Sequence, residues 1–236
     1  MRFLTLPAIL TLLSISETKT RVNLPKKLIL NLNIYLDPEW HQILGKDSLL
    51  TAQQVMKEAA QLFLLPSLNT KIELIHSNRF FNSSHHFRTL ARNMKKIVSE
   101  LRAPFSVPGA DSPKTMHRVA HVYLTHGGIV ESRSVDGSIC EEEKYSITAV
   151  QWGLDISSTA ATAAHGIGHL LGIGHDFDRK DNRGKDCDED NRRVFKHGED
   201  KREEWSDCSN QEFELYYQRV VRDQKNFCLE EVSIKK

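Results

Sequence analysis

Three histidines in the segment HGIGHLLGIGH, residues 165–175, have the type and spacing of a metal site. His165 and His169 are four residues apart, so on a helix both imidazoles project from the same face. Gly172 can adopt the left-handed conformation that ends a helix, which lets His175 turn back toward the other two. Zinc bound by three histidines keeps a fourth position open for water. The segment predicts a Zn²⁺ site, and histidines that bind no metal are the alternative.

The elements that position these histidines are predicted from apolar patterns. Ser158 and Thr159 can cap a helix that runs through an alanine-rich stretch, residues 160–164, into the first histidine. Alternating or short apolar runs predict strands, and apolar residues at helical spacing predict helices. The predicted strands are residues 30–36, 72–75, 121–125 and 146–152, and the predicted helices are residues 52–63 and 87–101. Strands that alternate with helices indicate an α/β fold with a mostly parallel sheet.

The chain after His175 has a different character. Residues 176–205 are dense in charges of both signs, which is typical of a solvated loop. A final helix is predicted to begin at Ser209, with Glu212 completing a capping box. The buried stripe of that helix is predicted to be Phe213, Tyr216, Tyr217, Val220 and Val221. The organisation is one domain with a small C-terminal lobe.

Composition and the N-terminus bound the class of protein. The chain has 236 residues, 39% of them hydrophobic, and its net charge of +1 gives no reason to expect nucleic acid or membrane as a partner. Arg2 precedes an apolar run, residues 3–15, that is too short to span a bilayer. Residues 1–16 are therefore predicted to be a signal peptide, and the protein to be secreted and extracellular. A buried N-terminal helix is the alternative.

Four cysteines fit an oxidising compartment: Cys140, Cys187, Cys208 and Cys228. An even number in a secreted chain predicts two disulfides, and the sequence leaves three pairings open. None of the four forms a CxxC pair, so a zinc knuckle or a redox motif is not expected.

The histidine segment resembles the zinc signature HExxHxxGxxH of the metzincins. Its flanks and several distant segments are similar to the adamalysin (reprolysin) family of metalloproteases, namely Ala163-Ala164, Leu171-Gly172, Asp176, residues 137–140 and residues 205–209. The resemblance covers residues 28–229, which we expect to form the adamalysin-like domain. It implies a metzincin-type twisted, mostly parallel sheet with an antiparallel edge strand, long helices and a small C-terminal lobe.

The resemblance also implies partners and cross-links. Zinc would lie at the floor of a cleft, where it would polarise a scissile carbonyl and activate water. An extended peptide would pair with the edge strand near residues 128–139. The expected partner is an extracellular protein or peptide, bound by a monomer. The implied disulfides join Cys140 to Cys228 and Cys187 to Cys208.

Gly166 departs from the family motif at the position of the catalytic glutamate. That glutamate takes a proton from the zinc-bound water and passes it to the leaving nitrogen, a role worth about 10²–10⁴-fold in rate. Glycine has no side chain, so proteolysis is predicted to be lost or vestigial, while zinc binding does not need this residue. Because glutamate is the better helix former, Gly166→Glu is expected to leave folding intact. It is expected to raise hydrolysis by at least about 10²-fold if the rest of the cleft is intact, and to need Phe195→Met as well if Phe195 has displaced the floor of the site.

Two further departures agree with a changed site. Phe195 occupies the position of the family's methionine below the zinc, and its larger, stiffer side chain can displace the floor of the site. Only residues 17–27 separate the predicted signal peptide from the domain, so the prodomain of active relatives is not expected. A truncated gene product would give the same sequence.

Three interpretations of function are open. The first is a secreted, zinc-binding pseudoenzyme that holds a peptide or protein in its cleft. The second is an active zinc metalloendopeptidase with a substitute proton carrier, and the third is an interaction domain without metal. Peptide cleavage that a chelator abolishes would favour the second over the first, and metal content separates the third from both.

Overall fold

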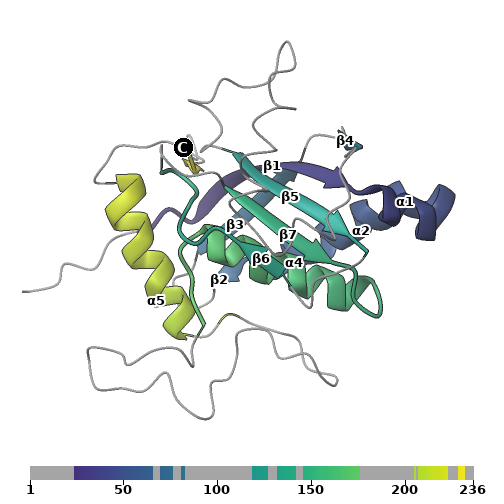
Figure 1. The fold of residues 1–236 in the computed structure, drawn as a ribbon. Coiled ribbons are helices and arrows are strands. Elements are labelled where there is room, and N and C mark those ends of the chain that lie inside the picture. Colours follow the sequence, from purple (N-terminus) through teal and green to yellow (C-terminus); the bar gives the residue numbers. More distant parts are fainter. Residues whose placement is uncertain are drawn as a thin grey trace, which may run out of the picture.

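Four parallel strands form the centre of a mixed sheet, and an antiparallel strand lies at each end. The computed structural model describes residues 24–65, 70–76, 81–82, 119–126, 132–141, 146–175, 205, 207–222 and 228–231. Within these residues the strand order is β2-β3-β1-β5-β7-β6 (Figure 1). The mostly parallel α/β sheet with an antiparallel edge strand is thus confirmed. The strands in this order are β2 (Leu64–Leu65), β3 (Thr70–His76), β1 (Lys27–Leu36), β5 (Val119–Thr125), β7 (Ile147–Gln151) and β6 (Ser132–Ser134).

Strand β1 lies at the centre of the sheet and shows why these segments form strands. Every second side chain of its first part is buried, and Leu28, Leu30 and Ile34 have no exposed surface. This period of two matches the alternation of side chains along a strand. Two short strands, β4 (Phe81–Asn82) and β8 (Glu230–Glu231), also pair with β1. The predicted strand therefore exists and is longer than the sequence indicated.

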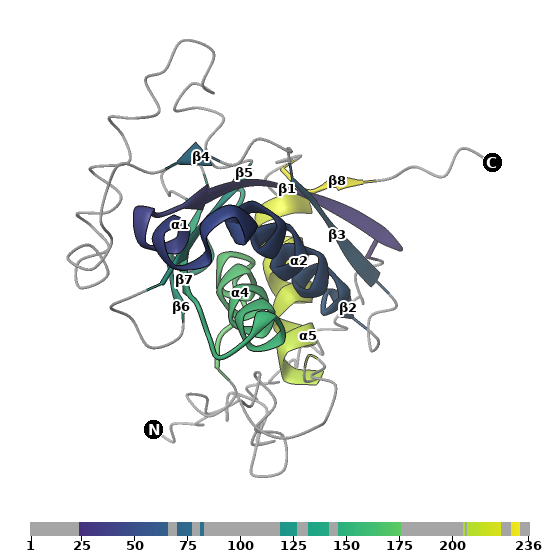
Figure 2. The ribbon, with the colours of Figure 1, turned by 90° about the vertical axis from the view of Figure 1, so that its right-hand side faces the viewer.

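Three helices lie on one side of the sheet, the first beyond the end of β1 and the other two against the face of the sheet (Figures 1 and 2). They are α1 (Pro38–Leu44), α2 (Ser48–Gln61) and α4 (Ile156–Leu170), with a 3₁₀ turn, η1 (Gly45–Asp47), between the first two. Helix α1 begins where the carboxylate of Asp37 accepts a hydrogen bond from the amide of Trp40. Helices α2 and α4 share a core in which the side chains of Val55, Met56 and Ala59 meet small residues of α4. Close packing against alanines brings α4 near to both α2 and the sheet.

The last helix, α5 (Asp207–Tyr216), continues as a π-helical segment, η6 (Tyr217–Arg222). It begins two residues before the predicted start, so Ser209 lies inside its first turn and is fully buried. The predicted capping box at this serine is therefore wrong. The predicted buried stripe is confirmed for Phe213, Tyr216, Tyr217 and Val220, while the side chain of Val221 lies outside the described residues.

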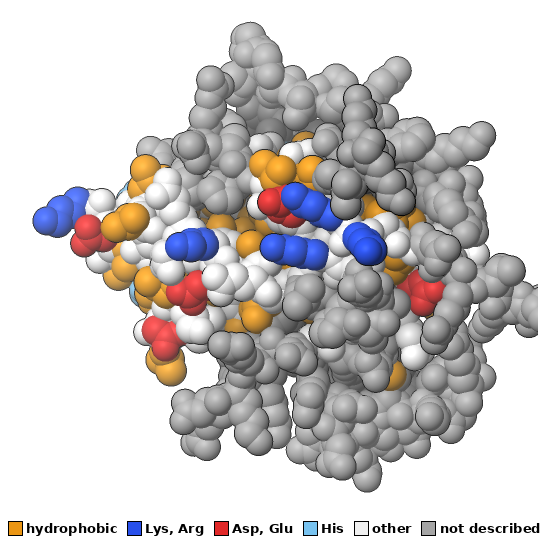
Figure 3. All heavy atoms as spheres, turned by 180° about the vertical axis from the view of Figure 1, so that it is seen from behind, with side chains coloured by type: hydrophobic (Ala, Val, Ile, Leu, Met, Phe, Trp, Pro, Cys, Tyr) orange, Lys and Arg blue, Asp and Glu red, His pale blue; other side chains and the backbone are white. Residues whose placement is uncertain are grey.

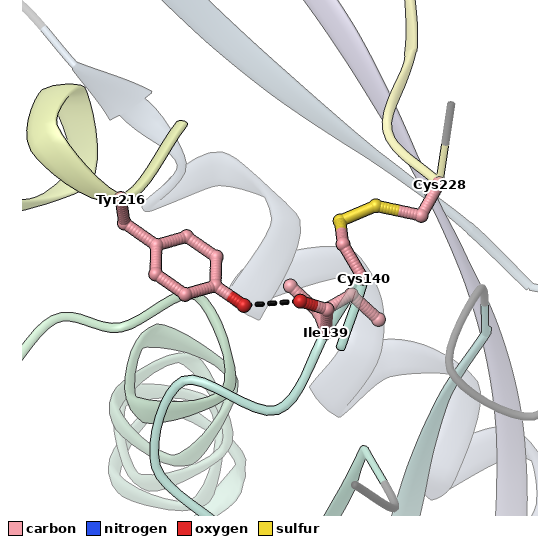
Figure 4. The surroundings of a disulfide bond; sticks show 4 residues. All are labelled: Ile139, Cys140, Tyr216 and Cys228. Carbon is pink, nitrogen blue, oxygen red and sulfur yellow. Dashed lines mark hydrogen bonds between the residues drawn. A yellow bond between two sulfur atoms is a disulfide. The ribbon is translucent and has the colours of Figure 1, made fainter. Parts of the chain in front are cut away.

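One disulfide joins the two ends of the C-terminal half of the chain. Cys140 is bonded to Cys228, with 5.3 Å between their α-carbons, so the loop after β6 is tied to the segment before β8 (Figure 4). This pairing is the one that the family resemblance implied. Cys208 is also disulfide-bonded. Cys187 lies outside the described residues, and its pairing stays a prediction.

Several expectations fall on parts of the chain that the structure does not describe. These are the signal peptide at residues 1–16, the helix at 87–101, and Phe195 with most of the charged segment around it. In the described ranges, no helix has the length and apolar character needed to cross a membrane. On the face seen in Figure 3, Lys and Arg side chains lie among Asp and Glu, as a net charge of +1 leads one to expect.

Candidate metal centre

The helix that carries the first two histidines is capped by an aspartate. The carboxylate of Asp155 accepts a hydrogen bond from the amide of Ser158 at 2.7 Å, and the hydroxyl of Ser158 accepts one from the amide of Asp155 at 3.1 Å. This reciprocal pair is a capping box, in which Ser158 is the third helical residue and not the cap as predicted. Thr159 also lies inside the helix. The hydrogen bond from the Ser158 amide is the main cause that lowers the pKa of Asp155.

Two histidines of α4 and one after it bring their ring nitrogens together. The Nε2 atom of His165 lies 2.7 Å from that of His169 and 2.9 Å from that of His175, and the last two are 3.1 Å apart. All three side chains are half-buried. They are the only group of three or more His, Cys, Asp or Glu in the described part of the chain close enough to hold a metal ion.

The protonation of His169 suits metal binding. Its Nδ1 atom lies 2.8 Å from the carbonyl oxygen of Ile173, and a carbonyl only accepts, so Nδ1 carries the proton and donates it. The lone pair of Nε2 then faces the two other rings. Burial lowers the pKa of His169, and the carboxylate of Asp136, 3.7 Å from Nδ1, acts in the opposite direction. The ring is neutral at pH 7, which is the form that coordinates a metal.

This donor set fits zinc. The three ring nitrogens lie 2.7–3.1 Å from one another, and a cation between them can accept a lone pair from each. Three nitrogen ligands with a position left for water are the typical set of catalytic zinc sites. His165, His169 and His175 would therefore hold the ion through their Nε2 atoms.

The turn that returns His175 to the site is held by α5. Gly172 has a φ of +76° and its amide donates to the carbonyl of His169, as the sequence predicted for a helix-ending glycine. A side chain at this glycine would collide with the ring of Tyr216. Two residues on, the amide of Gly174 donates to the carboxylate of Glu212 at 2.8 Å.

Glu212 is a functional residue that sequence reasoning assigned to the wrong task. It is 8% exposed and faces the turn, so its carboxylate supports the third histidine and does not cap its own helix. A signal existed in the sequence. Glu212 is four residues before Tyr216 and eight before Val220, so it shares the buried face of that helix.

The chain that follows the edge strand β6 is hydrogen-bonded to the end of α4. After it, the amide of Gly137 donates to the carbonyl of His169 at 2.8 Å, and the amide of Ser138 donates to that of Leu170 at 3.1 Å. Strand β6 pairs antiparallel with β7 and ends the sheet order, so among the described strands its outer edge has no neighbour. The end of α4 and the edge of the sheet are therefore held in one fixed arrangement.

Gly166 is buried against this edge. A β-carbon on it would lie less than 3.0 Å from Oγ1 of Thr148, 3.1 Å from Cβ of Ser132 and 3.2 Å from Oγ of Ser134. These contacts speak against the expectation that Gly166→Glu leaves folding intact. Helix propensity describes an isolated helix, whereas a side chain at residue 166 would also have to fit against β6 and β7.

Comparisons with known proteins point to one family. The family described as "Reprolysin (M12B) family zinc metalloprotease" matches residues 30–232. A search of curated proteins gave no match. Among solved structures, one described as "Structure of a chaperone-substrate complex" is 15% identical, with a TM-score of 0.43, and the similarity covers 64% of this chain and 27% of that one. This chain thus spans about a quarter of that protein, and so low a score carries no argument. Because the family match includes the sheet, α4 and all three converging histidines, the chain belongs to the reprolysin (M12B) family of zinc metalloproteases.

Proposed function

We propose that this protein is a secreted zinc-binding domain of the metalloprotease family in which proteolysis is lost or vestigial. It acts by holding an extracellular peptide or protein in its cleft. The observation that carries the proposal is the convergence of three histidine nitrogens directly beside a residue without a side chain, Gly166. The zinc site and the lost catalytic base are in this view separate features of one segment.

The chain keeps three histidines that can bind zinc, whereas residue 166 has no side chain that could transfer protons. Bound zinc would supply Lewis-acid polarisation of a carbonyl or of water. His169 is oriented for this by its bond to Ile173, and His175 by the turn that Glu212 holds. At Gly166 no group can accept or return a proton, and general acid–base catalysis of that kind is worth about 10²–10⁴-fold. Binding is therefore retained while turnover is lost.

Strand β6 supports the binding role. No other described strand pairs with its outer edge, whose main-chain donors and acceptors can bind an extended peptide by strand addition. Asp136 lies just after this strand; its side chain is 83% exposed and its carboxylate is 3.7 Å from Nδ1 of His169. A peptide that adds to β6 would therefore pass along the metal site.

The experiment measures metal content and hydrolysis on the same sample. The protein purified without added chelator should contain about one zinc per chain, by plasma mass spectrometry. His169→Ala should lose it, whereas His41→Ala, a histidine of α1 outside the cluster, should keep it. Against a broad peptide library, hydrolysis should be at least about 10²-fold below that of an active family member.

Each alternative gives a different result. Wild-type protein without metal would overturn the zinc site and leave an interaction domain. Hydrolysis at the rate of the active relative, abolished by a chelator, would overturn the loss of proteolysis. For secretion, expression in animal cells should place the protein in the medium with an N-terminus near residue 17, and retention inside the cells would refute this part.

A further inference from the structure

Three hydroxyl side chains gather behind Gly166, on the side of α4 that faces the edge of the sheet. Ser132 and Ser134 come from β6, and Thr148 comes from β7. Thr148 has no exposed surface and Gly166 is buried. The three residues are the nearest neighbours of the β-carbon that the glycine lacks.

The hydroxyls form a directed chain that ends on the helix. Oγ of Ser134 donates to the carbonyl oxygen of Gly166 at 2.8 Å. The Oγ atom of Ser134 also lies 2.7 Å from Oγ1 of Thr148. A hydroxyl has one proton, and that of Ser134 is used on the carbonyl, so Thr148 must donate to Ser134.

The carbonyl at the end of this chain belongs to the residue that follows His165. Its position therefore fixes the peptide unit next to the first histidine relative to β6 and β7. Buried hydroxyls cost free energy unless they are bonded, so a chain in which each donor has an acceptor holds one arrangement. This contact is one of those that fix the rotation of α4 about its axis, and with it the direction in which the side chain of His165 leaves the helix.

We propose that Ser134 and Thr148 are positioning residues of the metal centre, and that they occupy the room a side chain at residue 166 would need. The inference that these residues position His165 rests on the proposed zinc site. The inference that they fill the space beside Gly166 does not. In this view the glycine at residue 166 goes together with the hydroxyl side chains at residues 134 and 148, which fill the space of the missing side chain. Restoring it by one substitution fails, because the neighbours have filled its place.

The packing can be tested without any metal, by the direction in which Gly166→Ala shifts the midpoint of urea unfolding. In an open helix, Gly→Ala raises stability, since alanine is the better helix former. Here Gly166→Ala should lower the urea midpoint, because its methyl group meets Thr148. Thr148→Ala removes the closest obstructing atom and leaves Ser132 and Ser134 in place, so in that background Gly166→Ala should lower the midpoint less than it does in wild type.

Thr148→Val is the matched control, because it keeps the volume and removes the hydroxyl. Gly166→Ala should remain destabilising in the Thr148→Val background. If the Gly166→Ala single variant has a midpoint equal to or above that of wild type, the inference that the space beside Gly166 is filled is wrong. Equal effects of Gly166→Ala in the Thr148→Ala and Thr148→Val backgrounds would overturn it as well.

Metal affinity examines positioning. Ser134→Ala should weaken Zn²⁺ binding by about tenfold in competition with a chromophoric chelator, the lower end of the range for supporting groups around metal sites. It should also alter the visible spectrum of the Co²⁺-substituted protein, which a merely structural role would leave unchanged. Ser157→Ala, at an exposed position near the start of α4, is the control. Unchanged affinity and spectrum in Ser134→Ala would overturn positioning, whereas wild-type protein that binds no metal would overturn the proposed function and leave the urea results standing.

Hydrolysis gives a third reading. Gly166→Glu alone should gain no peptidase activity, and Gly166→Glu with Thr148→Ala should gain at least about 10²-fold. If Gly166→Glu alone keeps the wild-type urea midpoint and cleaves peptides, the room exists and the proposal is wrong. If neither variant cleaves although the double variant is folded and binds zinc, the inference that these neighbours block the base is wrong.

Discussion

Acid should destabilise this fold through one buried histidine, His121 of β5. Its side chain is 3% exposed, and its Nδ1 atom lies 3.0 Å from the hydroxyl of Tyr35 on β1. The ring of Tyr35 lies 5.8 Å from that of His121 and stacks on the ring of Tyr123 at 4.3 Å, centroid to centroid. Burial lowers the pKa of His121 from 6.5 to about 4. In the folded protein the ring is therefore neutral at any pH well above 4.

The sign and size of the effect follow from this shift. The unfolded chain binds a proton at His121 below about pH 6.5, while the folded chain does so only below about pH 4. Stability is therefore full above pH 6.5 and falls as the pH drops toward 4. A difference of about 2.5 in pKa, at about 1.4 kcal/mol for each unit, corresponds to about 3 kcal/mol, most of which is lost by pH 4.

Urea unfolding at pH 7 and pH 4 tests the reasoning when wild type is compared with His121→Asn. Asparagine can place an acceptor near the position of Nδ1 for Tyr35 but does not titrate. A chelator in every sample removes metal, so the three histidines of the metal centre contribute equally to both proteins. The loss of stability between the two pH values should be about 3 kcal/mol larger in wild type. Parallel losses in the two proteins would show that His121 is not held neutral by burial.

Three further changes probe the supports of the site. Asp155→Ala removes the cap of α4 and should lower the free energy of unfolding by about 1 kcal/mol in urea, with Asp155→Asn near wild type; equal losses in both would refute the capping role. Tyr216→Phe removes the hydroxyl that donates to the carbonyl of Ile139 (Figure 4) and should lower it by about 1–3 kcal/mol, and an unchanged melting temperature would contradict that bond. Replacing both Cys140 and Cys228 by alanine opens a link across 88 residues and should lower it by about 4–5 kcal/mol, measured without reductant; a loss below about 1 kcal/mol would contradict the chain-entropy estimate.

The parts that could be predicted from the sequence are those set by local pattern. The period-two burial of β1 and the positive φ of Gly172 are local properties, and both were read from neighbouring residues. What was missed depends on contacts across the chain. Glu212 looked like a cap because it follows Ser209 by three, yet its partner is 38 residues away at Gly174.

Gly166 shows the same limit at the centre of the site. Its effect on chemistry follows from the missing side chain, which one position of the sequence reveals. Its effect on packing depends on Thr148 and Ser134, which are brought to it by the pairing of β6 with β7. Helix propensity contains no information on the pairing of strands, so it could not reveal the contacts that a side chain at residue 166 would meet.

The dependence of His175 on α5 has a consequence for the order in which this protein is completed. During synthesis the histidine segment leaves the ribosome before Glu212 and Tyr216, which hold the turn at Gly172 and Gly174. A nascent chain at that stage has two histidines on a helix and a third without a fixed place. If the histidines hold zinc as proposed, tight uptake of the metal would wait until the C-terminal helix has docked. A chain cut before residue 207 should then bind zinc weakly although every histidine of the segment is still present.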